Sequence, residues 1–363
     1  MLDFRYLAMA VAIVHYWLLG MRGGERVVEA LCRLAPDADI FTLFYDPEKV
    51  SPLIRSRRVQ ASFLNSMKWC YRSLLPLTPM ALEHFDLRGY DLVISSESGP
   101  AKGVITASTT RHVCYCHTPM RYLWDLYPDY LHEWTRSRVK RALMAPVANY
   151  LRVWDFTTAA RVDEFVANSE NVRRRIFKTY RRESEVIHPP VAVETFQHET
   201  AEDYYLVVSE LVSYKRLDLA IRYFARTGRK LRVAGDGPQF RELRRAAGGC
   251  VEFCGRVPDH QLRTLFARCR ALVLPGEEDF GMTAVEAVAS GKAVIALGRG
   301  GVLESVPPEG AFLFDAPDEN ALGEAIGRFE AAEAAIPHAA LQAFAARFSE
   351  AEFDRKMRAV LYR

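Results

Sequence analysis

Two glutamates flank a Phe-Gly step in the stretch Pro275-Gly-Glu-Glu-Asp-Phe-Gly-Met-Thr-Ala-Val-Glu286. The apolar residues 271–274 before it indicate a buried strand, and the residues after Gly281 indicate a helix. Backbone N–H groups at a helix start can bind a phosphate or sugar hydroxyls, and a glycine permits close approach. Carboxylates accept hydrogen bonds from paired hydroxyls, so Glu278 and Glu286 suit a sugar and a ribose. Acidic residues are also common at helix starts, so a solvated helix face remains the alternative.

The residues on either side of this motif alternate between strand-like and helix-like patterns. Apolar runs of strand length recur between helical segments in both halves of the chain. The expected strands are residues 7–14, 40–44, 92–94, 112–116, 165–167 and 185–187 in the first half, and 204–208, 231–234, 251–254, 271–274 and 293–296 in the second. Such alternation forms parallel sheets with right-handed crossovers. We therefore predict an α/β protein with two Rossmann-like, doubly wound domains and a ligand in the cleft between them.

The boundary between the domains is expected where this alternation is interrupted. Two prolines in His188-Pro-Pro190 force extended backbone, and the polar residues 194–203 are typical of a linker. We place the first domain at residues 1–193, the second at 194–347 and a C-terminal helix at 348–363. A chain of 363 residues, half of them hydrophobic and a quarter charged, has the size and composition for two globular domains.

The composition argues against several other classes of protein. Seven cysteines without framework spacing indicate free thiols in a reducing compartment, so we expect a cytoplasmic protein. The apolar residues 6–19 are too few to span a bilayer, and a buried strand explains them better than a signal peptide. The cysteines lack the two-pair spacing of a zinc site, and Asp37-Ala-Asp39 is interpreted as a turn. We expect no metal and no bound cofactor.

Three further features are expected to face the same cleft. Lys215 and Arg216 follow the first strand of the second domain, where cations would stabilise a diphosphate leaving group. Gly23-Gly24 precedes a helix of the first domain but lacks the rest of a Walker or dinucleotide-binding motif. His117 ends a predicted strand, where an imidazole can donate to a sugar hydroxyl. Solvated cations and a structural histidine are the alternatives.

Basic residues outnumber acidic residues by 12 to 5 within residues 131–182. The excess includes Arg136, Arg138, Lys140, Arg141, Arg173, Arg174, Arg175, Lys178, Arg181 and Arg182. A stretch of this kind can hold an anionic lipid surface or a pyrophosphate-bearing acceptor. A solvated helix face explains any single run equally well.

Taken together, these residues resemble glycosyltransferase family 4, the retaining enzymes of the GT-B fold, over nearly the whole chain. In the second domain the resemblance rests on Lys215-Arg216, Gly235-Asp-Gly-Pro238, Gly255-Arg-Val257, the spaced glutamates and Ala287-Val-Ala-Ser-Gly291. In the first domain it rests on Ile13-Val-His15, Gly23-Gly-Glu25, Cys116-His-Thr-Pro-Met-Arg-Tyr-Leu-Trp124, Asn168-Ser169 and Val186-Ile-His-Pro-Pro-Val191. These motifs are similar to those of a mannosyltransferase-like subset that builds bacterial surface polysaccharides on polyprenyl diphosphate carriers.

The resemblance implies which residues bind a nucleotide sugar. The catalytic set would be His117 near the C6 hydroxyl of the sugar, Lys215 on the diphosphate and Glu278 on the sugar. Glu286 would bind the ribose. The other donor contacts would come from glycine turns and a helix start: Gly23, Gly24, Arg216, Gly255, Arg256, Val257, Phe280, Gly281, Met282 and Thr283.

The implied reaction is a retaining transfer of a hexose, with mannose from GDP-mannose as the best match, to a polyprenyl-diphosphate-linked saccharide. In this family the acceptor attacks from the front face, and the leaving phosphate helps to take its proton without a metal. One departure is Glu210, in Ser209-Glu210-Leu211, where many members carry arginine. Either Arg216 substitutes for that cation or diphosphate binding is weaker.

Two alternatives share the fold. A non-catalytic GT-B protein would bind a nucleotide sugar or a partner without transfer, which Glu210 favours, and an epimerase or phosphorylase would use the same domains. The intact set of Glu278, Glu286, Lys215 and His117 favours a transferase.

The resemblance also bears on the C-terminus and on the location of the protein. GT-B enzymes commonly return their last helix to the first domain, so residues 348–363 are expected to pack there. We expect the protein in the cytoplasm, peripheral on the cytoplasmic face of the inner membrane if its basic residues contact lipid.

Overall fold

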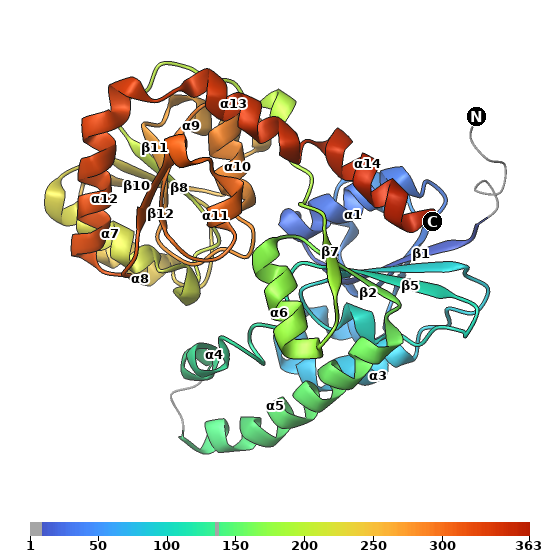
Figure 1. The fold of residues 1–363 in the computed structure, drawn as a ribbon. Coiled ribbons are helices and arrows are strands. Elements are labelled where there is room, and N and C mark those ends of the chain that lie inside the picture. The colour runs from blue at the N-terminus through green and yellow to red at the C-terminus, as the bar shows by residue number, and fades with distance from the viewer. Residues whose placement is uncertain (1–8, 135–137) are drawn as a thin grey trace, which may run out of the picture. The chain divides into compact units, whose positions relative to one another are not determined.

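The computed structural model describes residues 9–134 and 138–363, which divide into two compact units. The first unit comprises Met1–Pro190 and Phe353–Arg363, and the second comprises Val191–Glu352. Each unit contains one parallel sheet with helices on its faces (Figure 1). The chain passes from the first unit to the second after residue 190, whereas the predicted boundary was residue 193. Val191 belongs with the second unit because its backbone N donates to Phe348 O at 3.0 Å.

The sheet of the first unit has seven strands in the order β3-β2-β1-β4-β5-β6-β7. Their bounds are β1 Val11–Leu18, β2 Asp39–Tyr45, β3 Val59–Ala61, β4 Leu92–Glu97, β5 Arg111–Cys116, β6 Glu164–Ala167 and β7 Ser184–Val186. The first strand was predicted at residues 7–14 but starts four residues later, because it pairs with β2 from Ala12 to Leu18. The edge strand β3 was not predicted, since its three residues are only partly buried.

Helices cover both faces of this sheet (Figure 1). On one face, α1 (Gly23–Leu34) and α14 (Glu350–Leu361) pack on Ile13, Ile94 and Tyr115. On the other, α3 (Thr78–Glu83) and α5 (Arg138–Thr158) pack on Val14 and Phe41, and α6 (Glu170–Tyr180) packs on β5 and β6. Strands apolar on both sides are typical of a parallel sheet buried between helices. This unit also contains α2 (Pro52–Arg55), the 3-10 segment η3 (Phe63–Leu77) and α4 (Tyr127–Trp134).

The last helix is held on the first unit by packing and by hydrogen bonds. Phe353 packs edge-on against Tyr115, with ring centroids 5.6 Å apart. The guanidinium of Arg111 donates to Val360 O at 2.7 Å and to Leu361 O at 3.0 Å, which satisfies carbonyls that the helix end leaves unpaired. The chain therefore returns to the first unit at Phe353, slightly after the expected residue 348, because Phe348 packs on Phe280 of the second unit.

The sheet of the second unit has six strands in the order β10-β9-β8-β11-β12-β13. Their bounds are β8 Tyr205–Val208, β9 Leu231–Ala234, β10 Val251–Gly255, β11 Ala271–Leu274, β12 Ala293–Leu297 and β13 Ala311–Phe314. The helices are α7 Leu217–Thr227, α8 Phe240–Ala246, α9 Asp259–Arg268, α10 Met282–Ala289, α11 Val302–Ser305, α12 Glu319–Ala332 and α13 His338–Ala345. The first five strands were predicted, and β13 was not. The strand order reverses between β8 and β11, where ligands of open α/β sheets usually bind.

A buried polar network fixes α5 and α6 within the first unit. Asp155 on α5 is fully buried and pairs with the ammonium of Lys102, which is also fully buried. The same carboxylate accepts from Trp124 Nε1 at 2.7 Å and from the Tyr180 hydroxyl at 3.0 Å. A charge in a protein interior is tolerated only with partners of this number and quality.

We expect Asp155→Ala to destabilise the first unit strongly, because it leaves the Lys102 ammonium buried without its counter-charge. Losing one partner of a buried pair costs about 3–5 kcal/mol, which lowers the melting temperature of a unit of this size by roughly 6–20 °C. Differential scanning calorimetry of the whole chain measures the shift. Arg173→Ala, which removes the half-exposed Arg173–Glu170 pair, is the control and should cost at most about 1 kcal/mol. Equal shifts for the two variants would contradict this view of the network.

Candidate functional site

The structure brings together two predicted catalytic residues at the carboxyl edge of the second sheet. Lys215 lies in the loop after β8 and Glu278 in the loop after β11, and these strands are neighbours. Lys215 Nζ lies 2.5 Å from Glu278 Oε2, and the two side chains are 18% and 15% exposed. A short, largely buried pair of this kind orients both groups. An ammonium and a carboxylate are thus fixed side by side at the edge where a ligand is expected.

Close contacts at three glycines join the loops after β8 and β12 to the loop of Glu278. A Cβ on Gly276 would lie 2.7 Å from the backbone of Lys215, so only glycine permits this approach. On the other side, a Cβ on Gly300 would lie 2.2 Å from Glu278 O, and Gly301 N donates to that oxygen at 2.8 Å. The Gly300-Gly301 turn was not predicted as part of the site. The glycine-rich sequence directly after the predicted strand 293–296 was the available signal.

The helix α10 exposes one narrow stripe beside this pair. Its alanines and valines are buried, whereas Met282, Thr283 and Glu286 are partly exposed. Gly281 caps the helix in the left-handed conformation at φ 90°, which favours glycine. The stripe therefore contains the two first-turn residues and the glutamate that were predicted to bind the donor. Phe280 is buried against Phe348, so it could contact a ligand only through its backbone.

The remaining predicted turns lie along the same edge of the sheet. Gly235 N donates to Gly255 O at 2.8 Å, and Leu211 N donates to Asp236 O at 3.0 Å, which joins three successive loops. A Cβ on Gly235 would lie 1.9 Å from Ser209 O, so the Ser209-Glu210-Leu211 loop is fixed against this glycine. Arg256 is exposed and Val257 is partly exposed.

Arg216 has left-handed backbone, with φ 51°. Its guanidinium lies 3.3 Å from Asp218 and 3.5 Å from Pro317 O. These contacts give the guanidinium two structural partners, whereas Lys215 carries the pair with Glu278.

A histidine cluster lies at the carboxyl edge of the first sheet. Ser96 Oγ is 2.9 Å from His117 Nε2, and Ser96 O is 3.1 Å from His15 Nδ1. A Cβ on Gly24 would lie 3.4 Å from the His15 ring and 3.8 Å from His117 Nε2, so the predicted glycine turn borders both imidazoles. Ser96 and His15 were not predicted as site residues. Their side chains come from two strands, and only the fold places them beside His117.

His15 is fully buried and has one nitrogen without a partner. Its Nδ1 faces a carbonyl and so carries the proton, which leaves Nε2 as an acceptor. This Nε2 has no hydrogen-bond partner among the described residues. Burial, and secondarily the nearby His117, lowers the pKa of His15 to about 3, so the ring stays neutral at physiological pH. A neutral acceptor next to the Gly24 turn can receive a hydrogen bond from a ligand hydroxyl.

The basic stretch of the first unit is only partly described. Arg136 lies outside the described residues, and so do the side chains of Arg138, Lys140 and Arg141. Arg175 pairs with Asp125 at 3.4 Å, and Arg182 donates to Ala159 O at 2.8 Å, which gives these two structural roles. Four cations on or next to α6 are exposed: Arg173, Arg174, Lys178 and Arg181.

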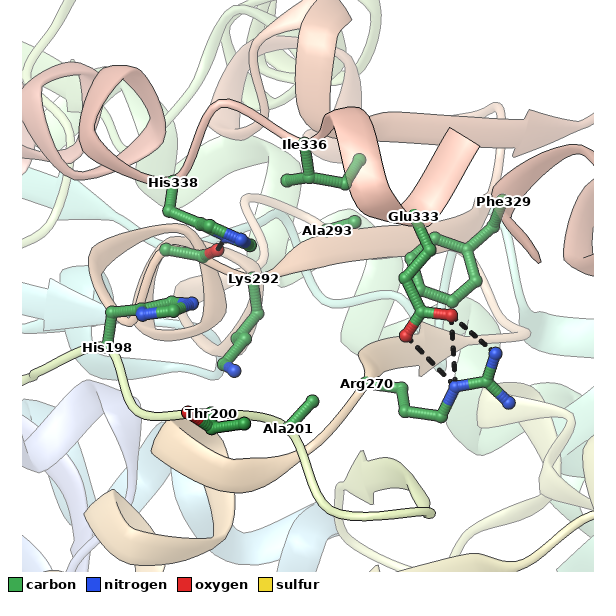
Figure 2. A pocket seen from close by; sticks show the side chains of 11 residues that line it. His198, Thr200, Ala201, Arg270, Lys292, Ala293, Phe329, Glu333, Ile336 and His338 are labelled. Atoms are coloured by element: carbon green, nitrogen blue, oxygen red, sulfur yellow. Dashed lines mark hydrogen bonds and ion pairs between the residues drawn. The ribbon is translucent and has the colours of Figure 1, made fainter. Parts of the chain in front are cut away.

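Residues 9–134 and 138–363 contain neither a metal-binding cluster nor a membrane-spanning helix. These residues include no cluster of three or more His, Cys, Asp or Glu side chains suited to a metal ion. None of their helices has the length and apolarity needed to cross a membrane. A cavity of about 220 Å³, whose lining side chains are drawn in Figure 2, lies in the second unit at the amino-terminal edge of the sheet. Lys215 and Glu278 lie at the carboxyl edge.

Two Rossmann-like units with a cation–carboxylate pair beside a helix start are the features of a GT-B glycosyltransferase, and comparisons with known proteins agree. Residues 21–195 match the family described as Glycosyltransferase Family 4, and residues 193–349 match Glycosyl transferases group 1. The chain is a glycosyltransferase of the GT-B fold and belongs to glycosyltransferase family 4.

Individual relatives are distant but match most of the chain. Alpha-1,3/1,6-mannosyltransferase ALG2 of Mus musculus is 24% identical over 366 aligned positions, which cover 86% of this chain and 85% of that protein. The structure of Anabaena HepE with UDP-glucose has a TM-score of 0.70 at 17% identity, covering 97% of this chain and 99% of that one. Sucrose-phosphate synthase from Thermosynechococcus elongatus also has a TM-score of 0.70 at 17% identity, over 97% and 98% of the two chains. At these identities the two structures establish the shared fold.

We expect Gly276→Ala to weaken nucleoside diphosphate binding at least about tenfold, because the new methyl group would push the Lys215 loop away from Glu278. Isothermal titration with UDP and with GDP measures the change. Gly249→Ala is the matched control, since a Cβ there meets no atom within 4 Å. Unchanged binding in the Gly276 variant would contradict a diphosphate site at this pair.

We expect the stability of the first unit to fall between pH 6.5 and pH 5 through His15 and His112. Burial lowers their pKa values to about 3 and about 4, so the unfolded chain takes up protons that the folded chain refuses. For each histidine, the free energy of unfolding then decreases by up to about 1.4 kcal/mol for every unit that the pH falls. Urea midpoints across this window should show a smaller slope in His15→Asn than in the unsubstituted chain. Equal slopes would mean that His15 is not held neutral.

Proposed function

We propose that this protein is a retaining hexosyltransferase that moves mannose from GDP-mannose to a saccharide carried on a polyprenyl diphosphate. The observation that carries the proposal is the Lys215–Glu278 pair at the carboxyl edge of the second sheet. One partner suits a diphosphate and the other suits sugar hydroxyls. The similarity to a mannosyltransferase of Mus musculus supports mannose as the transferred sugar.

Lys215 would bind the diphosphate of the donor. An ammonium has three N–H groups, and a bond to Glu278 leaves the others for phosphate oxygens. The amides of Met282 and Thr283, in the first turn of α10, would complete the phosphate contacts, since helix starts favour anions. The pair with Glu278 is neutral as a whole, so these amides would carry part of the charge stabilisation.

The two glutamates would bind different parts of the donor. Glu278 would accept hydrogen bonds from the sugar hydroxyls while it orients Lys215. Glu286, one turn beyond Met282 on the exposed stripe of α10, would accept from the two ribose hydroxyls. The turn of Gly255, Arg256 and Val257 would contact the base.

In the proposed reaction the bond between the anomeric carbon and the diphosphate oxygen breaks. The acceptor oxygen bonds to the anomeric carbon on the same face, and its proton passes to the departing phosphate oxygen. Negative charge therefore grows on the diphosphate, where Lys215 would stabilise it. His117 would hydrogen-bond to a sugar hydroxyl near C6, with His15 Nε2 as a further acceptor at the same edge of the first sheet.

We also propose that the protein works in the cytoplasm at the inner face of the membrane. Tyr150, Val153 and Phe156 on α5 are 52%, 57% and 47% exposed and recur at helical spacing, which is typical of an interfacial helix. Exposed cations of α6, such as Arg174 and Lys178, would attract anionic lipid.

A non-catalytic nucleotide-sugar-binding protein is the second candidate. Glu210 favours this candidate, because a carboxylate next to a diphosphate site would repel the bound diphosphate. A transfer assay with a polyprenyl-diphosphate disaccharide acceptor separates the two functions, since binding without product supports this candidate.

We expect Lys215→Met to lower kcat/KM for transfer from GDP-mannose by about 10²–10³-fold, since it removes the cation that stabilises the leaving group. A radiolabelled transfer assay measures the rate. Lys230→Met is the matched control, because Lys230 is 64% exposed at the other edge of the same sheet and should leave the rate unchanged.

Two outcomes would overturn parts of the proposal. If the Lys215→Met chain transferred sugar at the rate of the unsubstituted chain, the Lys215–Glu278 pair would have no role in catalysis. Thermal stabilisation by UDP-sugars with none from GDP-mannose would refute the proposed donor while leaving the transferase assignment intact.

A further inference from the structure

The amino-terminal edge of the second sheet contains a cavity of about 220 Å³, at the opposite end of the strands from Lys215 and Glu278. Its lining combines apolar side chains with several charged or titratable ones. The latter are His198, Arg270, Lys292, Glu333 and His338. None of these residues belongs to the proposed donor site, so binding of the donor does not account for the charged lining of this cavity.

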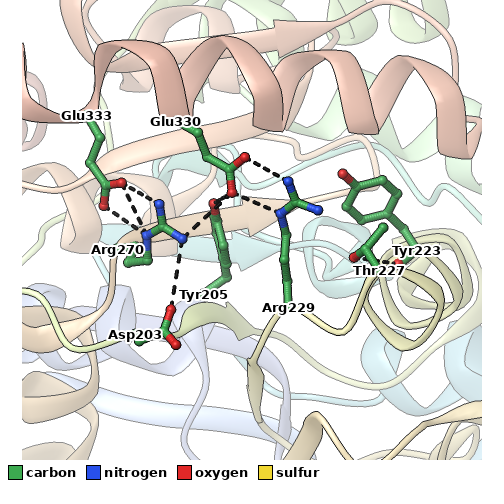
Figure 3. Close-up of polar contacts among 8 residues, drawn as sticks. All are labelled: Asp203, Tyr205, Tyr223, Thr227, Arg229, Arg270, Glu330 and Glu333. Atoms are coloured by element: carbon green, nitrogen blue, oxygen red, sulfur yellow. Dashed lines mark hydrogen bonds and ion pairs between the residues drawn. The ribbon is translucent and has the colours of Figure 1, made fainter.

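One wall of the cavity has its charges already balanced. The guanidinium of Arg270 lies 2.5 Å from Glu333 Oε2 and 3.7 Å from Glu330, and it also approaches Asp203 (Figure 3). Glu330 in turn accepts from Arg229 at 2.7 Å. This network ties α12 to the start of the strands, and it leaves Arg270 without excess charge to offer a ligand.

Lys292 differs from Arg270 because its charge is not balanced. Its side chain is buried, with only 2% of the residue exposed. Its Nζ donates to the carbonyl oxygen of Glu199 at 2.7 Å, and no carboxylate of the described residues lies within ion-pair distance. The carboxylate of Glu199 pairs instead with Arg268 at 2.7 Å. An ammonium with three N–H groups and one neutral acceptor is costly to bury.

Two histidines, His198 and His338, line the cavity on the same side as this ammonium. The rings of His198 and His338 are 3.9 Å apart, and His338 Nδ1 lies 2.7 Å from Gly291 O. A Cβ on Gly291 would lie 3.1 Å from the His198 ring and 3.2 Å from His338, and its left-handed φ of 66° favours glycine. Figure 2 shows both rings and the Lys292 side chain on one side of the cavity, with the Arg270–Glu333 pair on the other.

We propose that this cavity is a binding site for a phosphate group, separate from the donor site. Among the described charged groups of its lining, Lys292 is the one with no carboxylate within ion-pair distance, so the lining as a whole favours an anion. Beyond its bond to Glu199 O, the ammonium of Lys292 has two further N–H groups for an anion, and the ring of His198 adds an N–H donor. Phe329 and Ile336 on the apolar wall suit the carbon part of a phosphate monoester.

The charges around the histidines give the site a pH dependence. Burial, then Lys292 and His338, lowers the pKa of His198, and burial lowers the pKa of Lys292. The other charged groups facing them are Arg270, Glu333 and the more distant carboxylate of Glu199. A bound anion favours the protonated form of His198, so its affinity rises as the pH falls.

Isothermal titration of the whole chain with sulfate tests the site, because sulfate keeps its charge between pH 6 and pH 8. We expect saturable binding that weakens as pH rises, and a loss of about tenfold or more in Lys292→Met. Lys230→Met is the control and should bind like the unsubstituted chain. His198→Ala and His338→Ala, which change exposed residues, should each weaken binding severalfold even if the Lys292 variant is unstable.

Inorganic phosphate and a hexose 1-phosphate distinguish the sources of the anion. Tighter binding of the ester, lost with Ile336→Ser, assigns the site to a phosphorylated metabolite, and equal binding assigns it to free phosphate. Equal sulfate affinity in Lys292→Met and the unsubstituted chain, or no saturable binding at all, would overturn the proposal.

Discussion

The ion pair between Lys215 and Glu278 depends on places where backbone approaches backbone too closely for any side chain. Gly276 lies against the backbone of Lys215, and Gly300 lies against the carbonyl of Glu278. The contact at Gly276 holds together two loops whose charged residues are 63 positions apart in the chain, and the contact at Gly300 fixes the backbone of Glu278, so together they set the 2.5 Å pair. A charged pair preorganised in this way needs little rearrangement when a diphosphate binds, which is how electrostatic catalysis gains most of its effect.

The parallel sheet of the second unit separates two kinds of chemistry. All its strands run the same way, so the loops with Lys215, Glu278 and the start of α10 gather at the carboxyl edge. The amino edge carries the Arg229, Arg270 and Glu330 network, which fastens α12 to the strands. The buried ammonium of Lys292 at that edge has no carboxylate within ion-pair distance among the described residues, unlike the guanidinium of Arg270. This uncompensated positive charge is the basis for a second anion site there.

Much of the fold could be predicted from the sequence, because strands such as Leu231–Ala234 and Ala271–Leu274 are short apolar runs between helical patterns. The strands Val59–Ala61 and Ala311–Phe314 were missed, since edge strands are partly exposed and carry a weak pattern. In the site, Lys215 and Glu278 were expected together, and the structure pairs them. The His15 nitrogen that has no hydrogen-bond partner among the described residues results from packing between strands that are far apart in the sequence, so no local sequence pattern predicts it.

Hydrogen exchange of the intact chain, with and without saturating nucleotide sugar, tests most directly whether the glycine-supported pair is the donor site. We expect new protection in two segments, residues 213–216 and 277–286, which hold the pair and the start of α10. We expect the amino edge around Lys292 to be unchanged. Protection confined to other parts of the second unit, with neither segment affected, would contradict a donor site at Lys215 and Glu278.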